Sequence, residues 1–189
     1  MYIIIELEPS GRQAKVEAVL AGKTELYAEI VERYQQIVAN LAYKLCGTKL
    51  EIDEVTQRVF VELYTALPRF RFDSKLSSFI YRITVNVVCK MMNSQRRYVS
   101  SDPQDDDDYR PELPSDDLNA EQQMVRREQL AQLRAAIGSL KSEQRTALVL
   151  YTYEDFSYQQ IADVMQCSLN KVESLIFRAK KNLAKMIKQ

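Results

Sequence analysis

Basic and aromatic side chains alternate between residues 69 and 97, a composition typical of a surface that binds single-stranded nucleic acid. This stretch has seven basic residues and one acid, Asp73. Basic groups follow a phosphate backbone, while aromatic rings stack on unpaired bases. Some of the rings fit a hydrophobic core equally well, so the pattern alone leaves both interpretations open. The residues are Arg69, Arg71, Lys75, Arg82, Lys90, Arg96 and Arg97, interleaved with Phe70, Phe72, Phe79 and Tyr81.

A second nucleic-acid signal lies near the C-terminus, where SYQQIADVMQCSLNKVESLIFRAKKNL has the layout of a helix-turn-helix. The small Ala162 allows a close helix crossing, Gln166 and Cys167 form the turn, and Ser168 caps the second helix. In such a unit the second helix enters the DNA major groove. Between residues 171 and 189, six basic side chains against one acid supply phosphate attraction. A plain helical hairpin with solvated lysines is the alternative.

Residue types that support catalysis or metal binding are scarce. The chain has no His and no Gly-rich phosphate loop, and Cys46, Cys89 and Cys167 lie far apart. We therefore expect no catalytic residue, no metal site, no cofactor and no disulfide framework, and an enzyme is the weakest hypothesis. The apolar start is interrupted by Glu6 and Glu8, which argues against membrane insertion and favours a cytoplasmic protein with reduced thiols.

The periodicity of apolar residues predicts an all-α protein. Apolar side chains recur every three or four positions, and Gly47 and Pro68 end the first two helices. Four Gly and no Trp agree with a helical chain. The expected helices span about 26–45, 52–67, 74–97, 124–137 and 147–151, with a break at Gly138–Ser139, then 158–165 and 168–187.

An acidic segment divides these helices into two groups. YVSSDPQDDDDYRPELPSDD, residues 98–117, holds eight acids and one base, whereas both flanking segments carry excess positive charge. Its prolines and few aliphatic residues predict a flexible linker, which self-repulsion keeps extended. We therefore predict two small helical domains joined by an acidic linker, with boundaries at 1–18 (extension), 19–97, 98–120 (linker) and 121–189.

Two segments in this order resemble bacterial sigma factors of the sigma-70 family, in the extracytoplasmic-function (ECF) group. DEVTQRVFVELYTALPRFRFDSKLSSFIYRITVNVVCKMMNSQRR resembles their region 2, and LKSEQRTALVLYTYEDFSYQQIADVMQCSLNKVESLIFRAKKNL resembles region 4. The resemblance covers about 19–97 and 129–188. It implies a region 2 helical bundle, a region 4 helix-turn-helix, and a role in promoter recognition by RNA polymerase.

The resemblance assigns a role to each group of residues. The segment 53–60 looks like the helix that docks on core polymerase, which implies contacts from Asp53, Glu54, Gln57 and Phe60. The loop and helix after it resemble the part that reads the minus-10 element as a melted strand with a flipped base. The residues carried over there are Arg71, Phe72, Asp73, Ser74, Lys75, Ser78, Phe79, Arg82, Asn86 and Lys90.

The resemblance further implies that the helix-turn-helix reads the duplex minus-35 element. The residues carried over are Ser157, Tyr158, Ser168, Asn170, Lys171, Glu173, Ser174, Arg178 and Lys181. The chain departs from the family pattern at Phe79 (usually Trp), at Gln166 (usually Gly) and at Leu175 (usually Arg). Leu175 cannot make the DNA contact of an Arg, and Glu173 favours cytosine or repels phosphate.

Two function classes besides an enzyme remain at this level. A sigma factor would bind core RNA polymerase and promoter DNA, and many family members also bind an anti-sigma protein. A stand-alone helix-turn-helix regulator would explain residues 140–189 but leaves the segment 53–60 and the basic aromatic stretch without a role.

Overall fold

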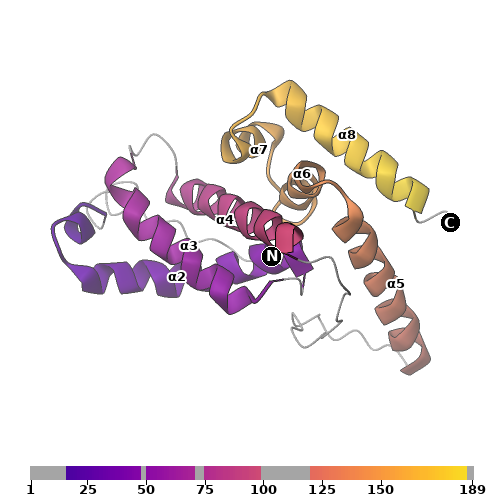
Figure 1. The fold of residues 1–189 in the computed structure, drawn as a ribbon, viewed down its shortest axis with the longest axis horizontal. Coiled ribbons are helices and arrows are strands. Elements are labelled where there is room, and N and C mark those ends of the chain that lie inside the picture. Colours follow the sequence, from indigo (N-terminus) through magenta and orange to yellow (C-terminus); the bar gives the residue numbers. More distant parts are fainter. Residues whose placement is uncertain (1–15, 48–49, 71–74, 99–119, 187–189) are drawn as a thin grey trace.

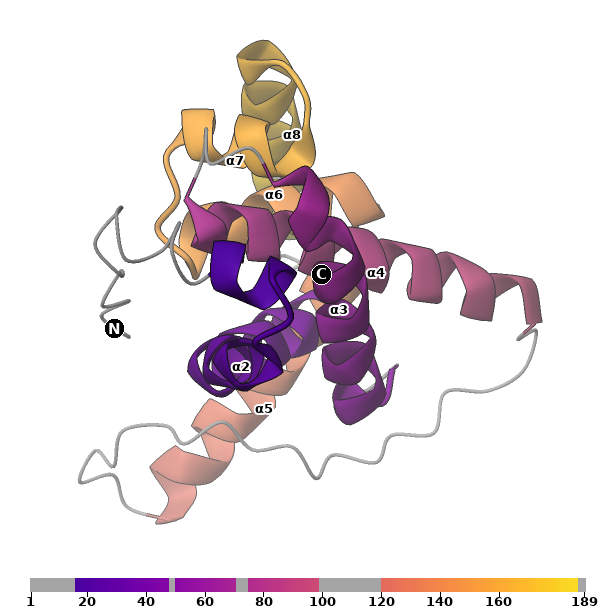
Figure 2. The ribbon, with the colours of Figure 1, turned by 90° about the vertical axis from the view of Figure 1, so that its left-hand side faces the viewer.

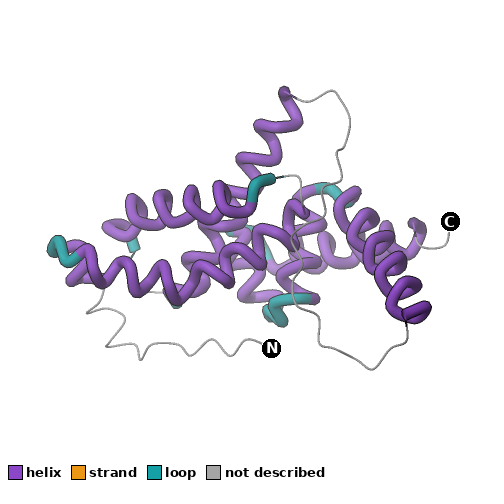
Figure 3. The backbone as a smooth tube through the Cα atoms, turned by 90° about the horizontal axis from the view of Figure 1, so that it is seen from below, coloured by secondary structure: helices purple, strands orange, loops and turns teal. Residues whose placement is uncertain are grey.

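The computed structural model describes residues 16–47, 50–70, 75–98 and 120–186, and within these ranges the regular elements are all helical (Figure 3). The all-α prediction is confirmed. Two groups of helices lie side by side (Figure 1). The N-terminal bundle consists of α2 (Thr24–Cys46), α3 (Ile52–Ala66), the 3-10 turn η2 (Leu67–Arg69) and α4 (Leu76–Tyr98). The C-terminal bundle consists of α5 (Ala120–Ser139), α6 (Ser142–Thr152), α7 (Tyr158–Met165) and α8 (Leu169–Met186).

The helices of the N-terminal bundle begin and end within two residues of the predicted positions. Gly47 follows α2 with φ +62°, a left-handed conformation that Gly adopts readily. Pro68 cannot continue α3, and the chain passes into η2. Val55, Val59 and Leu63 are fully buried along one side of α3, as their spacing predicts. The chain reverses after these helix ends, and α2, α3 and α4 pack against one another.

Helix α4 is buried on more than one side, and its sequence pattern did not predict the second buried side. It packs against α2 and α3 and also against α7 (Figure 2). Tyr81, Val85 and Cys89 follow one another at intervals of four residues and so share a face. The Tyr81 ring lies 4.7 Å from that of Phe156, and Cys89 Sγ lies 3.4 Å from Ser142 Oγ. This second face of α4 therefore holds the C-terminal bundle.

The C-terminal bundle has the predicted helix-turn-helix. Ser157 caps α7 in a reciprocal pair of hydrogen bonds with Gln160, which satisfies two backbone N–H groups. Ala162 is buried, and Val172 and Ile176 of α8 face inward, as predicted. Gln166 ends α7 with φ +50°, so the turn requires the left-handed conformation there. A non-glycine residue adopts it at a cost of roughly 1 kcal/mol.

One continuous hydrophobic core joins the two bundles. Buried residues from α2, α3 and α4 form a single cluster with residues of α6, α7 and α8. Val16 and Val19, in a short helical stretch, belong to the same cluster. The core therefore starts ahead of residue 19, where the N-terminal domain was expected to begin. The acidic segment predicted as a linker lies, from residue 99 onward, outside the described residues.

We predict that Gln166→Gly stabilises the chain by about 0.5–1 kcal/mol, because Gly removes the strain of positive φ and this outweighs the added freedom of the unfolded chain. The free energy of unfolding from urea titration is the measurement. Gln159→Gly is the matched control: it lies inside α7, where Gly costs about 1 kcal/mol. If Gln166→Gly were as destabilising as Gln159→Gly, strain at the turn would be ruled out.

Candidate functional site

An apolar groove of about 500 Å³ runs between α2 and α3. Two of its exposed side chains are apolar or aromatic: Val61, 60% exposed, and Tyr64. Its polar groups come mainly from the N-terminal half of α3. The lining residues are Tyr27, Val31 and Gln35 from α2, and Asp53, Thr56, Gln57, Phe60, Val61, Tyr64 and Thr65 from α3. An apolar floor with a polar end is suited to binding a protein helix.

Tyr27 fixes the shape of this groove. Its hydroxyl donates a hydrogen bond to the backbone carbonyl of Phe60, and its ring meets that of Tyr64 edge to face at 5.0 Å. Burial raises the pKa of the Tyr27 hydroxyl well above its ordinary value, so the group stays protonated and remains a donor. The two helices are therefore tied together at the groove itself.

The structure brings together three of the four residues that the sequence assigned to docking. Asp53, Gln57 and Phe60 all line the groove. Phe60 is nearly buried, so its ring contributes mainly to the floor. Glu54 does not line the groove and instead forms an exposed ion pair with Arg58 at 3.9 Å. Sequence reasoning missed the α2 residues. Periodicity placed Tyr27 and Val31 on a helix, but it could not show that they line a groove beside α3.

A polar stripe follows the exposed side of α4. Arg82, Asn86 and Lys90 recur every four residues, so their side chains share one face of the helix. Asn86 and Lys90 are exposed, and Arg82 is half-buried. Lys90 forms an exposed ion pair with Glu62 of α3 at 3.4 Å. The stripe therefore offers two cations and an amide side by side.

The start of α4 adds an aromatic group to this stripe. Phe79 is half-buried, stacks on Phe70 at 4.9 Å, and carries the guanidinium of Arg82 over its ring at 5.4 Å. Lys75 is exposed and Ser78 half-buried in the same turn. The core interpretation of Phe79 thus holds in part, because the ring packs on Phe70, and stacking on a base stays a prediction. Four further predicted residues, Arg71, Phe72, Asp73 and Ser74, lie outside the described residues.

The helix-turn-helix presents its outer surface through α8. Asn170, Ser174, Phe177 and Lys181 lie along the exposed side, flanked by Glu173 and Arg178. Phe177 is 67% exposed in the middle of this surface. Sequence reasoning missed Phe177 because an apolar residue in an amphipathic helix is expected to face the core. Its exposure gives the surface an apolar centre that suits a thymine methyl group.

Leu175 does not lie on this outer surface. It is 6% exposed and packs in the core with Val172 and Ile176. Leu175 therefore faces the core, and the proposed DNA-binding surface is formed by other side chains of α8. The other predicted residues near the turn support the fold: Ser168 Oγ accepts from the Lys171 backbone N–H, and the half-buried Tyr158 packs its ring against Tyr151.

Lys171 is already paired. Its Nζ donates to Glu143 Oε1 of α6 at 2.7 Å, and this hydrogen bond, with the carboxylate charge, raises the pKa of the ammonium group. Both side chains are exposed, so the pair adds little to stability. The pair holds the Lys171 ammonium group beside the Glu143 carboxylate, so this cation is not free to contact a DNA phosphate.

Two further findings concern the part of the chain that the structure describes. It contains no group of three His, Cys, Asp or Glu side chains that would hold a metal ion. Within the same ranges, no helix has the length and apolar character needed to cross a membrane.

The chain is similar to known proteins over most of its length. Residues 30–98 match sigma-70 region 2, and residues 130–183 match sigma-70 region 4. RNA polymerase sigma-H factor of Pseudomonas aeruginosa is 32% identical over 179 residues, 93% of each chain. ECF RNA polymerase sigma-E factor of Haemophilus influenzae is 30% identical, over 93% of this chain and 94% of that protein.

A solved structure shares the fold. The sigma factor RpoE of Bartonella quintana, determined in complex with the anti-sigma factor NepR, superposes with a TM-score of 0.66 over 86% of this chain and 96% of that chain. Its sequence identity is 19%, so the likeness concerns the fold.

We predict that Glu143→Gln strengthens binding to nonspecific duplex DNA and steepens its salt dependence by about one counterion, because Lys171 is released to contact phosphate. Fluorescence anisotropy across a range of salt concentrations gives both quantities. Glu54→Gln is the control, since it removes an exposed ion pair in the other bundle. An unchanged salt slope for Glu143→Gln would contradict a masking role for Glu143.

Proposed function

The chain belongs to the sigma-70 family of RNA polymerase sigma factors, in its ECF group, and we propose that three separate surfaces carry out its steps. As a sigma factor it binds core polymerase and directs promoter recognition, melting of the minus-10 region and transcription initiation. It is an initiation factor and has no catalytic task of its own. We assign region 2 to residues 19–97 and region 4 to residues 121–189.

The groove between α2 and α3 is the proposed docking site for core polymerase. The observation that supports it best is an open apolar groove bordered by Asp53 and Gln57. These residues lie within the region 2 match, in the segment 53–60 that resembles the docking helix of the family. Val61 and Tyr64 expose apolar surface that a partner helix would cover, while Gln57 supplies hydrogen bonds at the edge. Glu54, directed away from the groove, is expected to contribute less.

The polar stripe on α4 is the proposed contact with the melted minus-10 strand. Arg82 and Lys90 would follow the phosphates, Asn86 would hydrogen-bond a base, and Phe79 would stack beside it. The mean rise of a helix places Arg82 and Lys90 about 12 Å apart, which spans two or three nucleotides. The resemblance further assigns residues 71–74 to the binding of a flipped base, whose unstacking costs a few kcal/mol that protein contacts must offset.

The outer surface of α8 is the proposed reader of the minus-35 duplex. Asn170 and Ser174 have donors and acceptors for base edges, and Arg178 and Lys181 supply positive charge for phosphates. Glu173 favours a cytosine amino group. Phe177 adds an apolar contact that selects thymine, and this residue distinguishes the proposed surface from a purely electrostatic one.

We further propose that an anti-sigma protein binds this chain in the cytoplasm. The support is the shared fold with a sigma factor that was solved with its anti-sigma factor. The exposed groove and the exposed face of α8 are both available to such a partner. Pull-down of an anti-sigma protein by the full chain, competed by core polymerase, tests the assignment.

We predict that Val61→Asp weakens binding to core polymerase by at least about tenfold, because it places a charge in the centre of an apolar contact. The side chain is exposed, so folding is retained. Glu54→Ala, outside the groove on the same helix, is the control and should change the affinity little. Binding is measured by anisotropy with labelled sigma and purified core enzyme, and equal affinities for Val61→Asp and the unmodified chain would exclude the groove.

We predict that Phe177→Ala lowers affinity for the minus-35 duplex by about 1–2 kcal/mol and reduces discrimination between thymine and uracil at the contacted position, because the methyl contact is lost. The promoter is first found by transcription of genomic fragments with the reconstituted holoenzyme. Lys181→Ala serves for comparison, because losing a phosphate contact weakens all sequences alike and lowers the salt slope. Uniform weakening by Phe177→Ala would argue against base reading.

A further inference from the structure

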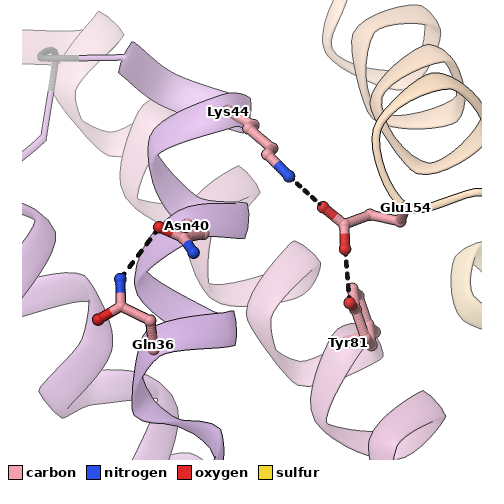
Figure 4. Close-up of polar contacts among 5 residues, drawn as sticks. All are labelled: Gln36, Asn40, Lys44, Tyr81 and Glu154. Carbon is pink, nitrogen blue, oxygen red and sulfur yellow. Dashed lines mark hydrogen bonds and ion pairs between the residues drawn. The ribbon is translucent and has the colours of Figure 1, made fainter. Parts of the chain in front are cut away.

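One carboxylate connects the two bundles. Glu154, in the loop between α6 and α7, accepts a hydrogen bond from Lys44 Nζ of α2 at 2.7 Å and another from the Tyr81 hydroxyl of α4 at 2.6 Å. Figure 4 shows the carboxylate pointing between these two helices. Each of its oxygens therefore binds a different helix of the N-terminal bundle.

The environment of Glu154 makes these contacts strong. Its side chain is 12% exposed and that of Lys44 is 31% exposed, so water screens the pair only in part. Burial, and after it the Glu154 charge, raise the pKa of the Tyr81 hydroxyl, which stays protonated and donates. A carboxylate this buried is costly unless both oxygens are satisfied. Glu154 thus depends on the N-terminal bundle being in place.

The residues on either side of Glu154 reinforce the contact. Phe156 packs on the Tyr81 ring at 4.7 Å, and Lys44 Nζ lies 5.4 Å from the centre of the Tyr153 ring. Asp155, between Glu154 and Phe156, has φ +52°, a left-handed conformation that is uncommon for a non-glycine residue. The loop 153–156 is therefore shaped by its contact with the other bundle.

This arrangement is too compact for promoter binding. Packed helices lie about 8–10 Å apart, so α8, which is one helix removed from α4, has its axis within roughly 20 Å of the minus-10 stripe. The minus-10 and minus-35 elements are centred about 25 base pairs apart, or ~85 Å of duplex at 3.4 Å per pair. The 21 residues between α4 and α5 can reach about 70 Å when extended, and the 20-residue helix α5 adds about 30 Å, so the chain is long enough to span both elements.

We propose that Glu154, Lys44 and Tyr81 form a clasp that holds the free sigma factor in a closed, inactive form, and that the clasp must release before both promoter elements are bound. The inference rests on the proposed placement of the two reading surfaces. Release exposes Tyr81 and Val85 and strips Glu154 of both partners. Binding to polymerase and promoter has to exceed that cost, so free sigma binds promoters poorly.

The native Cys89 provides a direct test. Its Sγ lies 3.4 Å from Ser142 Oγ across the interface, so Ser142→Cys places two thiols within reach of a disulfide only in the closed form. The full chain, carrying Ser142→Cys and Cys167→Ser, is treated with oxidised glutathione, and the rate of cross-linking is followed by gel mobility. Ala184→Cys, at the far end of α8, replaces Ser142→Cys as the control thiol and should not cross-link to Cys89.

The clasp is then weakened in this background. Glu154→Gln and Lys44→Met should each slow cross-linking by roughly tenfold, because either leaves a partly buried charge without its opposite charge. The exchange Lys44→Glu with Glu154→Lys should restore much of the rate. Gln36→Ala, which removes only the exposed hydrogen bond from Gln36 to Asn40 on α2, should leave the rate unchanged (Figure 4). A rate unaffected by Glu154→Gln and by Lys44→Met overturns the clasp.

Transcription with reconstituted holoenzyme separates this inference from the proposed function. The cross-linked chain should fail to initiate, and reduction of the disulfide should restore initiation. Equal transcription by the cross-linked and reduced forms overturns the closed form as an inactive state. If the reduced chain binds core polymerase but Val61→Asp binds equally well, the proposed docking groove is wrong while the clasp stands.

Discussion

The two-sided burial of α4 is the constraint on which the rest of the structure depends. One side packs on α2 and α3, and the side that carries Tyr81 and Val85 packs on the C-terminal bundle. Each large apolar side chain that is fully buried contributes about 1.5–3 kcal/mol relative to the exposed state. Among the α4 side chains that the structure describes, the exposed ones follow the remaining stripe, which includes Asn86 and Lys90. The same helix thus holds the core, joins the bundles and presents polar groups to a ligand.

The sequence predicted the helices well because their limits have local causes. Gly47 and Pro68 end α2 and α3 through backbone geometry alone, and Ser157 begins α7 through a cap that involves only its neighbour Gln160. The inward side chains of α3 and α8 follow from a spacing of three and four residues. The family of the chain also follows from two local motifs in order, and the comparisons confirm it.

The features that sequence missed depend on contacts between distant elements. Tyr27 contributes to the groove because α3 lies beside it, and Phe177 is exposed because Leu175 and Ile176 already fill the core side of α8. The sequence around Glu154 has no apolar periodicity and suggests only an exposed acid in a loop. Its hydrogen-bond partners lie 110 and 73 positions away in the sequence. Periodicity describes one helix at a time, so it cannot assign such residues.

The three proposed surfaces and the clasp use different residues, so docking on core polymerase does not require the clasp to open. The groove involves residues 27–35 of α2 and the outer side of α3, whereas the clasp uses Lys44 at the far end of α2. Val61 is exposed while the bundles are closed, so polymerase can dock before the clasp opens. Reading both promoter elements cannot precede opening, because α4 and α8 lie too close together. The proposed surfaces therefore allow core binding to come first, with separation of the bundles following on the enzyme.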